Sequence, residues 1–189
     1  MNIIPIPVSF DRIFVLPASV SLYSLIVNAN QNTYYKIYVL TSDNGVASLL
    51  DLDALYKVSK QFDINFIYLE NAFENAFEVR EITKATYYRL LLPDLLPDTD
   101  KIIYMDVDTI IQSDLSDLFS VDLSVSFLAA FLDYGMSKEE GGLKYIHDVL
   151  KIDTDTYIQA GFMVLNLSRL REYNIVEKCK RLSCYNYLY

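Results

Sequence analysis

The sequence predicts a three-layer α/β domain with a mostly parallel central sheet, and three observations support this fold class. Short apolar runs alternate with segments of helical spacing along the chain. The run Ile102–Met105 is typical of a buried strand, and two carboxylates, Asp106 and Asp108, follow it immediately. The 189 residues suffice for one sizeable core. We therefore expect residues 1–189 to form a single domain.

Three strands and three helices are expected before this central strand. The strands, each a short apolar run, are Ile3–Val8, Lys36–Leu40 and Ile64–Leu69. Pro5 and Pro7 suit an edge strand or the start of a strand because proline cannot donate to a sheet ladder. The helices, each with helical apolar spacing, are expected from Pro17, around Leu49–Ser59 and over Thr83–Leu92. Pro93 is expected to end the last of them.

Four elements are expected after the central strand. Ser113 and Asp114 are predicted to cap a short helix, and Phe127–Leu132 is a further strand. The polar segment Gly135–Asp155 suggests a flexible flap. The last expected strand and helix are Phe162–Leu167 and Ser168–Leu182.

Composition excludes several classes of function. A net charge of −9 argues against non-specific nucleic-acid binding and against a generally basic membrane-binding surface. The start of the chain lacks the pattern of a signal peptide, and no apolar run reaches transmembrane length. Cys179 and Cys184 have no histidine nearby, so we expect free thiols in a cytoplasmic protein.

The carboxylate pair is the strongest chemical signal. In an α/β sheet, ligands bind in the crevice beyond the carboxyl ends of the strands, which is where Asp106 and Asp108 are expected. Carboxylate oxygens suit Mg²⁺ or Mn²⁺, and such an ion suits a diphosphate. The sequence therefore predicts a divalent-metal site at this edge of the sheet.

Four motifs in one order resemble glycosyltransferase family 8 over nearly the whole chain. They are Ser9-Phe10-Asp11, Thr83–Leu90, Asp100–Asp108 and Gln159–Leu167. The resemblance implies a GT-A fold, which contains a Rossmann-like nucleotide-binding sheet. It also implies a retaining transfer of glucose or galactose from a UDP-sugar, with Mn²⁺ or Mg²⁺, to a glycan or lipid-linked saccharide. Family relatives act in lipopolysaccharide synthesis, so the resemblance places this protein at the inner face of the cytoplasmic membrane.

The resemblance also assigns roles to individual residues. Asp106 and Asp108, with Val107 between them, hold the metal and the donor diphosphate. Asp11 reads the uracil edge, and Phe14 stacks on the base. The resemblance implies further donor contacts for Arg89, Asp133, Gln159, Ala160 and Gly161. It also implies that Arg89 and Gln159 are catalytic, together with Asp106 and Asp108.

The sequence departs from the family pattern at three places. Gln159 stands where the family usually has Asn, and Ile13-Phe14 replaces a frequent Asn-Tyr pair. The family also continues beyond the point that matches Tyr189, with an Asp-Gln-Asp segment, a histidine metal ligand and a membrane-associating tail. We therefore expect either a fragment or a naturally short protein, whose exposed apolar surface is either covered in a homodimer or makes the chain prone to aggregation.

Two alternatives stay open at this point. The first is a non-catalytic or truncated nucleotide-sugar-binding module. The second is a phosphatase of the haloacid dehalogenase type, which also places Asp-x-Asp after an apolar strand and uses the first Asp as nucleophile. In such enzymes the motif lies near the N-terminus, whereas three expected strands precede it here.

Overall fold

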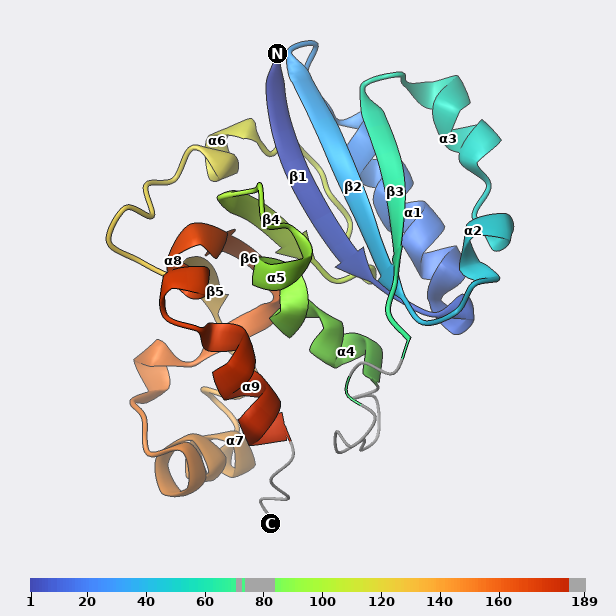
Figure 1. Cartoon of the computed structure of the whole chain (residues 1–189). Coiled ribbons are helices and arrows are strands. Elements are labelled where there is room, and N and C mark those ends of the chain that lie inside the picture. The colour runs from blue at the N-terminus through green and yellow to red at the C-terminus, as the bar shows by residue number, and fades with distance from the viewer. Residues whose placement is uncertain (71–72, 74–83, 184–189) are drawn as a thin grey trace.

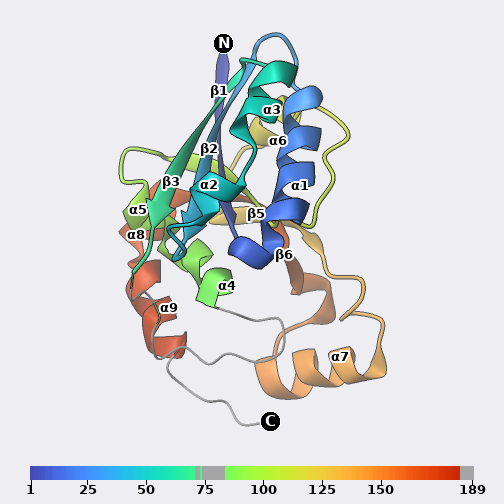
Figure 2. The ribbon, with the colours of Figure 1, turned by 90° about the vertical axis from the view of Figure 1, so that its right-hand side faces the viewer.

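The computed structural model describes residues 1–70, 73 and 84–183. Six strands form two three-stranded sheets within these residues, with helices on both sides (Figures 1 and 2). The fold is therefore the α/β class predicted from the sequence. The expected helix start at Thr83 and the second cysteine, Cys184, lie outside the described residues.

The first sheet is parallel, in the order β1-β2-β3. Its strands are β1 (Asn2–Ser9), β2 (Thr33–Thr41) and β3 (Phe62–Tyr68), one or more residues longer than expected at most ends. Helices α1 (Val15–Val27), α2 (Val46–Leu49) and α3 (Leu52–Val58) lie on one side of it (Figure 2). The single helix expected around Leu49–Ser59 is thus two short helices.

The two prolines of β1 explain where this sheet ends. The backbone N–H groups of Asn2 and Phe10 donate to β2 residues or their neighbours, so the even-numbered residues of β1 face β2. Pro5 and Pro7 therefore lie on the opposite edge of β1, where a missing N–H breaks no existing hydrogen bond. The expectation of an edge strand is confirmed.

The second sheet is antiparallel, in the order β4-β6-β5. It contains β4 (Lys101–Met105), β5 (Leu128–Leu132) and β6 (Ile158–Asn166). β4 lies in contact with β1, between it and β6 (Figure 1). The central position expected for Ile102–Met105 is therefore correct, but its ladder partner β6 runs in the opposite direction. Apolar periodicity carries no information on strand direction, so the sequence pattern missed this pairing.

Alternating residues of β2, β4 and β6 divide the buried side chains into two cores, as expected for strands covered on both faces. The first core joins the strands to α1 and α3; β4 contributes Ile103 and Met105. The second joins them to the helices on the other side; β4 contributes Ile102 and Tyr104. The sheets are thus the middle layer of three.

The remaining helical segments are short. They are a 3₁₀ turn (Arg12–Phe14), α4 (Lys84–Tyr88), a 3₁₀ turn (Arg89–Leu91), α5 (Leu92–Leu95), α6 (Ser116–Phe119), α7 (Glu140–Lys144), a π-helical turn (Tyr145–Leu150), a 3₁₀ turn (Thr154–Thr156), α8 (Leu167–Glu172) and α9 (Ile175–Ser183). Within the described segments, every helix is too short or too polar to traverse a bilayer.

These bounds correct two local expectations and add secondary structure to a third segment. Pro93 lies in the first turn of α5 instead of ending a helix, since a first-turn proline loses no helical hydrogen bond. The last helix is interrupted between α8 and α9, where Asn174 has φ 51°; asparagine tolerates this left-handed conformation. The segment 135–155, expected to be a flexible flap, carries α7 and the π-helical turn.

Candidate active site

A cleft of about 490 Å³ opens where β1 and β4 end, beside α4 and the following turn. Its lining comes from the first strand–helix loop, the α4 region and the end of β4. The lining residues are Ser9, Phe10, Asp11, Phe14, Ala85, Thr86, Arg89, Tyr104, Asp106, Val107 and Asp108. Three sequence-predicted groups, around Asp11, Arg89 and Asp106, are thereby brought together from distant parts of the chain.

The first strand–helix loop forms one side of the cleft. Asp11 caps the 3₁₀ turn that follows it, because its carboxylate accepts a hydrogen bond of 2.9 Å from the N–H of Ile13. Phe14 ends the same turn, and this residue is 43% exposed. Ser9 ties this loop to α4, since its hydroxyl donates to the carbonyl of Ala85 at 2.7 Å. An aromatic face and a carboxylate are thus held at one end of the cleft.

Asp106 lies at the centre of a hydrogen-bond network on the other side. Its Oδ1 accepts from Nη2 of Arg89 at 3.0 Å and from the hydroxyl of Tyr104 at 2.8 Å. Arg89 also donates to the carbonyls of Ala160, at 2.6 Å, and Thr86, at 2.9 Å. The Arg89 side chain is only 13% exposed. A largely buried guanidinium with three hydrogen bonds thus fixes Asp106 against β6.

Tyr104 is the group that the sequence analysis missed. Burial raises the pKa of Tyr104 far above its ordinary value, against the opposing charge of Arg89, so the hydroxyl keeps its proton and donates to Asp106. The available signal was period-two alternation: residues two apart in a strand share a face, which places Tyr104 beside Asp106.

The turn that carries the carboxylate pair is held by a side chain-to-backbone hydrogen bond and by burial of its middle residue. The hydroxyl of Thr109 donates to the carbonyl of Asp106, and Val107 is buried, with 5% of its surface exposed. Asp108 is exposed and lines the cleft. The turn therefore presents two carboxylates to the same opening.

Gln159, Ala160 and Gly161 lie inside β6, whereas the sequence placed them just before that strand. The N–H of Asp106 donates to the carbonyl of Gly161 at 2.6 Å, and the N–H of Gly161 donates to Oε1 of Gln159 at 2.7 Å. A Cβ at Gly161 would lie 2.6 Å from Oδ2 of Asp106 and 2.7 Å from Nε2 of Gln159. Glycine therefore lets β6 approach the carboxylate without displacing the Asp106 or Gln159 side chain.

Among the predicted site residues, Gln159, Ala160 and Gly161 are outside the cleft lining, and so is Asp133. It follows β5, and its carboxylate accepts from the N–H of Met136 at 2.9 Å, which caps the turn that follows. This geometry is that of an ordinary turn residue.

The carboxylates of the cleft suit a divalent ion that is bound partly by the protein and partly by a substrate. No cluster of three or more His, Cys, Asp or Glu side chains suited to a metal occurs among the described residues. Mg²⁺-type ions are commonly held by one or two carboxylates together with substrate phosphates. Asp106 and Asp108 supply such a pair of carboxylates. Because residue 161 is glycine, no Cβ lies against Oδ2 of Asp106, and the two residues therefore fit a divalent ion.

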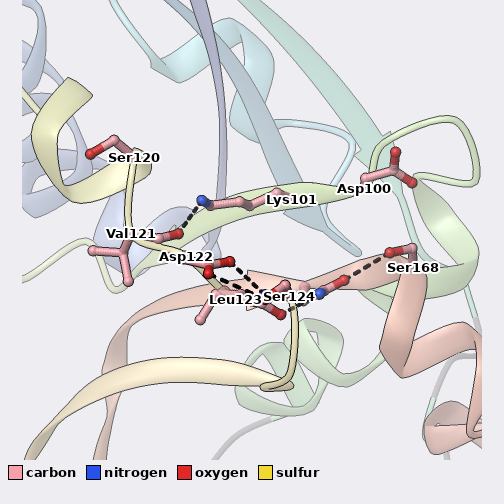
Figure 3. A pocket seen from close by; sticks show the side chains of 9 residues that line it. Asp100, Lys101, Ser120, Val121, Asp122, Leu123, Ser124 and Ser168 are labelled. Atoms are coloured by element: carbon pink, nitrogen blue, oxygen red, sulfur yellow. Dashed lines mark hydrogen bonds between the residues drawn. The ribbon is translucent and has the colours of Figure 1, made fainter.

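A second pocket, of about 360 Å³, lies at the opposite end of β4 (Figure 3). Its polar groups largely bond to one another. Lys101 donates to the carbonyl of Val121 at 2.5 Å, Asp122 accepts from Ser124, and Asn166 donates to the carbonyl of Leu123. These bonds hold the loop after α6 against the sheet, so the role of these polar groups is to stabilise the fold.

A Rossmann-like α/β domain with a carboxylate pair at the end of a central strand defines the GT-A class of fold. The chain belongs to glycosyl transferase family 8, whose family model matches residues 5–186. This finding confirms the resemblance and the fold class predicted from the sequence, and it removes the phosphatase alternative.

Individual relatives agree with this assignment. The chain is 31% identical over 160 residues to General stress protein A of Bacillus subtilis (strain 168), covering 82% of this chain and 53% of the relative. It thus spans about half the length of that relative. Among solved structures, the bifunctional glycosyltransferase WbbM matches with a TM-score of 0.80 and 25% identity, over 96% of this chain and 34% of that chain.

The fold is also that of the galactosyltransferase LgtC, solved in complex with donor and acceptor sugar analogs. That structure matches with a TM-score of 0.73 and 22% identity, over 96% of this chain and 67% of that chain.

Proposed function

We propose that residues 1–189 form the donor-binding domain of a retaining hexosyltransferase that uses a UDP-sugar, with glucose or galactose as the sugar. The observation that carries this proposal is the convergence of Asp11, Arg89 and Asp106 on one cleft. The family resemblance gave each of these residues a donor-site role, and they come from three separate parts of the chain. We also propose that residues 1–189 form one single domain.

The two ends of the cleft suit the two ends of a nucleotide sugar. At one end, the half-exposed ring of Phe14 stacks on the uracil, and the Asp11 carboxylate accepts from its imide N–H. At the other end, Asp106 and Asp108 hold Mn²⁺, or Mg²⁺ in its place, next to the diphosphate. Gln159 lies beside Asp106, and we assign its amide a contact with the donor sugar.

The reaction breaks the bond between the sugar and the diphosphate, so negative charge grows on the leaving group. When bound, the ion offsets this charge. The chain's own contribution is orientation: Arg89 and Gly161 hold Asp106 in place, and Phe14 with Asp11 fixes the nucleoside.

The acceptor and the cellular setting follow from the family. We assign a glycan or lipid-linked saccharide as acceptor, in lipopolysaccharide or other cell-surface polysaccharide synthesis at the inner face of the cytoplasmic membrane. LgtC, solved with donor and acceptor sugar analogs, supports a saccharide acceptor. Exposed apolar side chains on α1, with Leu16 75% and Val27 51% exposed, support a homodimer or a peripheral contact with the membrane.

The test combines calorimetry with turnover. UDP should bind this chain in a Mn²⁺-dependent manner, and one member of a panel of UDP-hexoses should be hydrolysed or transferred. Binding without turnover would favour the second candidate, a non-catalytic nucleotide-sugar-binding module. That candidate is kept because the chain spans 53% of General stress protein A. Absence of UDP binding with Mn²⁺ present would contradict both.

A further inference from the structure

Tyr104 and Arg89 bind the same oxygen of Asp106. Tyr104 is fully buried, and its hydroxyl reaches Oδ1 at 2.8 Å, while Nη2 of Arg89 reaches the same atom at 3.0 Å. The other oxygen, Oδ2, lies against Gly161, where a Cβ would come within 2.6 Å of it. The two oxygens of one carboxylate thus have different surroundings.

The fold explains why these groups meet. Tyr104 lies on β4 and belongs to the second core, and Asp106 follows two residues later, directly after the strand, so the two side chains point to the same side. Arg89 comes from the helical layer that covers this face, and its guanidinium lies 4.6 Å from the centre of the Tyr104 ring. The Arg89 guanidinium therefore packs on the face of the Tyr104 ring, while the Tyr104 hydroxyl and Nη2 of Arg89 both bind Oδ1 of Asp106.

We propose that Tyr104 is a positioning residue of the donor site: it fixes the Asp106 carboxylate through Oδ1, so that Oδ2 is the oxygen presented to the cation and diphosphate. This inference rests on the proposed function. With the hydroxyl removed, Arg89 alone holds Oδ1, and the carboxylate gains freedom to rotate about its side-chain bonds. Partners of a metal-binding carboxylate act in this way, and their removal commonly weakens metal affinity by about 10- to 100-fold.

The chain offers a matched control for the loss of a buried tyrosine hydroxyl. Tyr35 is also fully buried, and its hydroxyl donates to Asp114 at 3.3 Å and accepts from the N–H of Leu115 at 3.1 Å. This tyrosine–aspartate pair does not line the cleft. Tyr35→Phe therefore reports the cost of losing such a hydroxyl without touching the donor site.

The experiment measures UDP affinity by calorimetry, with and without Mn²⁺, for the wild type, Tyr104→Phe and Tyr35→Phe. Thermal unfolding is followed in parallel. We expect Tyr104→Phe to weaken Mn²⁺-dependent UDP binding by about tenfold or more, to leave metal-free UDP binding close to the wild type, and to lower the Tm by about as much as Tyr35→Phe does. Tyr35→Phe should lower the Tm and leave both affinities unchanged.

Two results would overturn the role of Tyr104. One is an unchanged Mn²⁺-dependent affinity in Tyr104→Phe. The other is an equal loss of metal-free and Mn²⁺-dependent binding, which a general structural defect would cause. If the wild type itself fails to bind UDP with Mn²⁺, the proposed function fails, and that outcome is visible before any variant is compared.

A double-mutant cycle tests whether Tyr104 acts through Asp106. In the Asp106→Asn background, we expect Tyr104→Phe to change the UDP affinity by less than about twofold, because the oriented carboxylate is already absent. If Tyr104→Phe still weakens binding by its full factor there, the hydroxyl contacts the ligand directly and the positioning role is wrong.

Discussion

Arg89 and Asp106 form an ion pair of 3.0 Å that joins the helical layer to the end of the central strand. The Arg89 side chain is 13% exposed and the Asp106 side chain 33%, so the pair lies at the partly buried floor of the cleft. Because the same guanidinium also bonds the carbonyl of Ala160, it connects the carboxylate pair with β6.

This relationship predicts that lysine cannot replace Arg89. One ammonium group lacks the planar fork that reaches Asp106, Ala160 and Thr86 together. We expect Arg89→Lys to lower UDP-hexose turnover by about 100-fold, since small displacements of catalytic groups have effects of this size. Arg181→Lys, an exposed change in α9, should retain wild-type turnover. Comparable turnover of Arg89→Lys and the wild type would contradict the role of the fork.

Asp108→Asn should keep the fold and weaken Mn²⁺-dependent UDP binding by about 2 kcal/mol, because a charged ligand is replaced by a neutral amide. Titration calorimetry with and without Mn²⁺ measures this difference. Asp100→Asn is the matched control, as Asp100 precedes the same strand at its other end and its side chain is 84% exposed. Unchanged affinity of Asp108→Asn in the presence of Mn²⁺ would exclude Asp108 as a ligand.

Gly161→Ala should disturb the site more than the fold. The added methyl group would overlap Oδ2 of Asp106 and the amide of Gln159, so one or both must move. We expect loss of Mn²⁺-dependent UDP binding by about tenfold or more. In Gly141→Ala the new methyl meets nothing within 4 Å, and alanine in helix α7 should raise the stability by about 0.5–1 kcal/mol. Wild-type binding by both variants would show that the approach at Gly161 is unimportant.

Arg171 is predicted to stabilise the fold without any part in the site. Its guanidinium donates to the carbonyls of Pro93, Leu96 and Thr99, which lie around the end of α5. Arg171→Met leaves these acceptors without their charged donor, and we expect a loss of about 2–3 kcal/mol in the free energy of unfolding. Urea unfolding measures it. Arg181→Met should change stability by less than about 0.5 kcal/mol, and equal stabilities of the two variants would refute the role of Arg171.

Asp114 should make the fold sensitive to acid. Burial raises its pKa, but hydrogen bonds from the Asn30 backbone and from Ser116 lower it further, to about 2. Its pKa in an unfolded chain is about 3.9. A depressed folded-state pKa adds stability above the unfolded value, and this stability is lost as pH falls from about 4 through 2. The stability difference between the wild type and Asp114→Asn should therefore shrink over that interval in urea unfolding; a constant difference would contradict this.

The strands, and the position of the carboxylate pair at the end of β4, could be predicted from the sequence because both depend on local pattern. Ile102–Met105 is apolar, short and followed by Asp106, and the structure places it in β4 as expected. Residue roles at the donor site stay predictions, although the cleft brings Asp11, Arg89 and Asp106 together.

Features that depend on tertiary structure were missed. The antiparallel direction of β6 has no signature in periodicity, and Gln159 to Gly161 became part of that strand instead of a loop before it. Asp133 was placed at the site by resemblance, whereas its carboxylate caps a turn outside the cleft lining. The bond from Tyr104 to Asp106 needed the strand face to be known first.

The prolines of β1 have a mechanical consequence. Pro5 and Pro7 deprive the edge facing β4 of two donors, and in the described part of the chain the two sheets are separate hydrogen-bonded units. Asp11 follows one unit and Asp106 the other, so the gap between them depends on the packing of the core to which Ile6 and Ile103 belong. Sliding of one sheet past the other breaks no hydrogen bonds between strands. The size of the core residues at the junction of the two sheets can therefore change the width of the cleft.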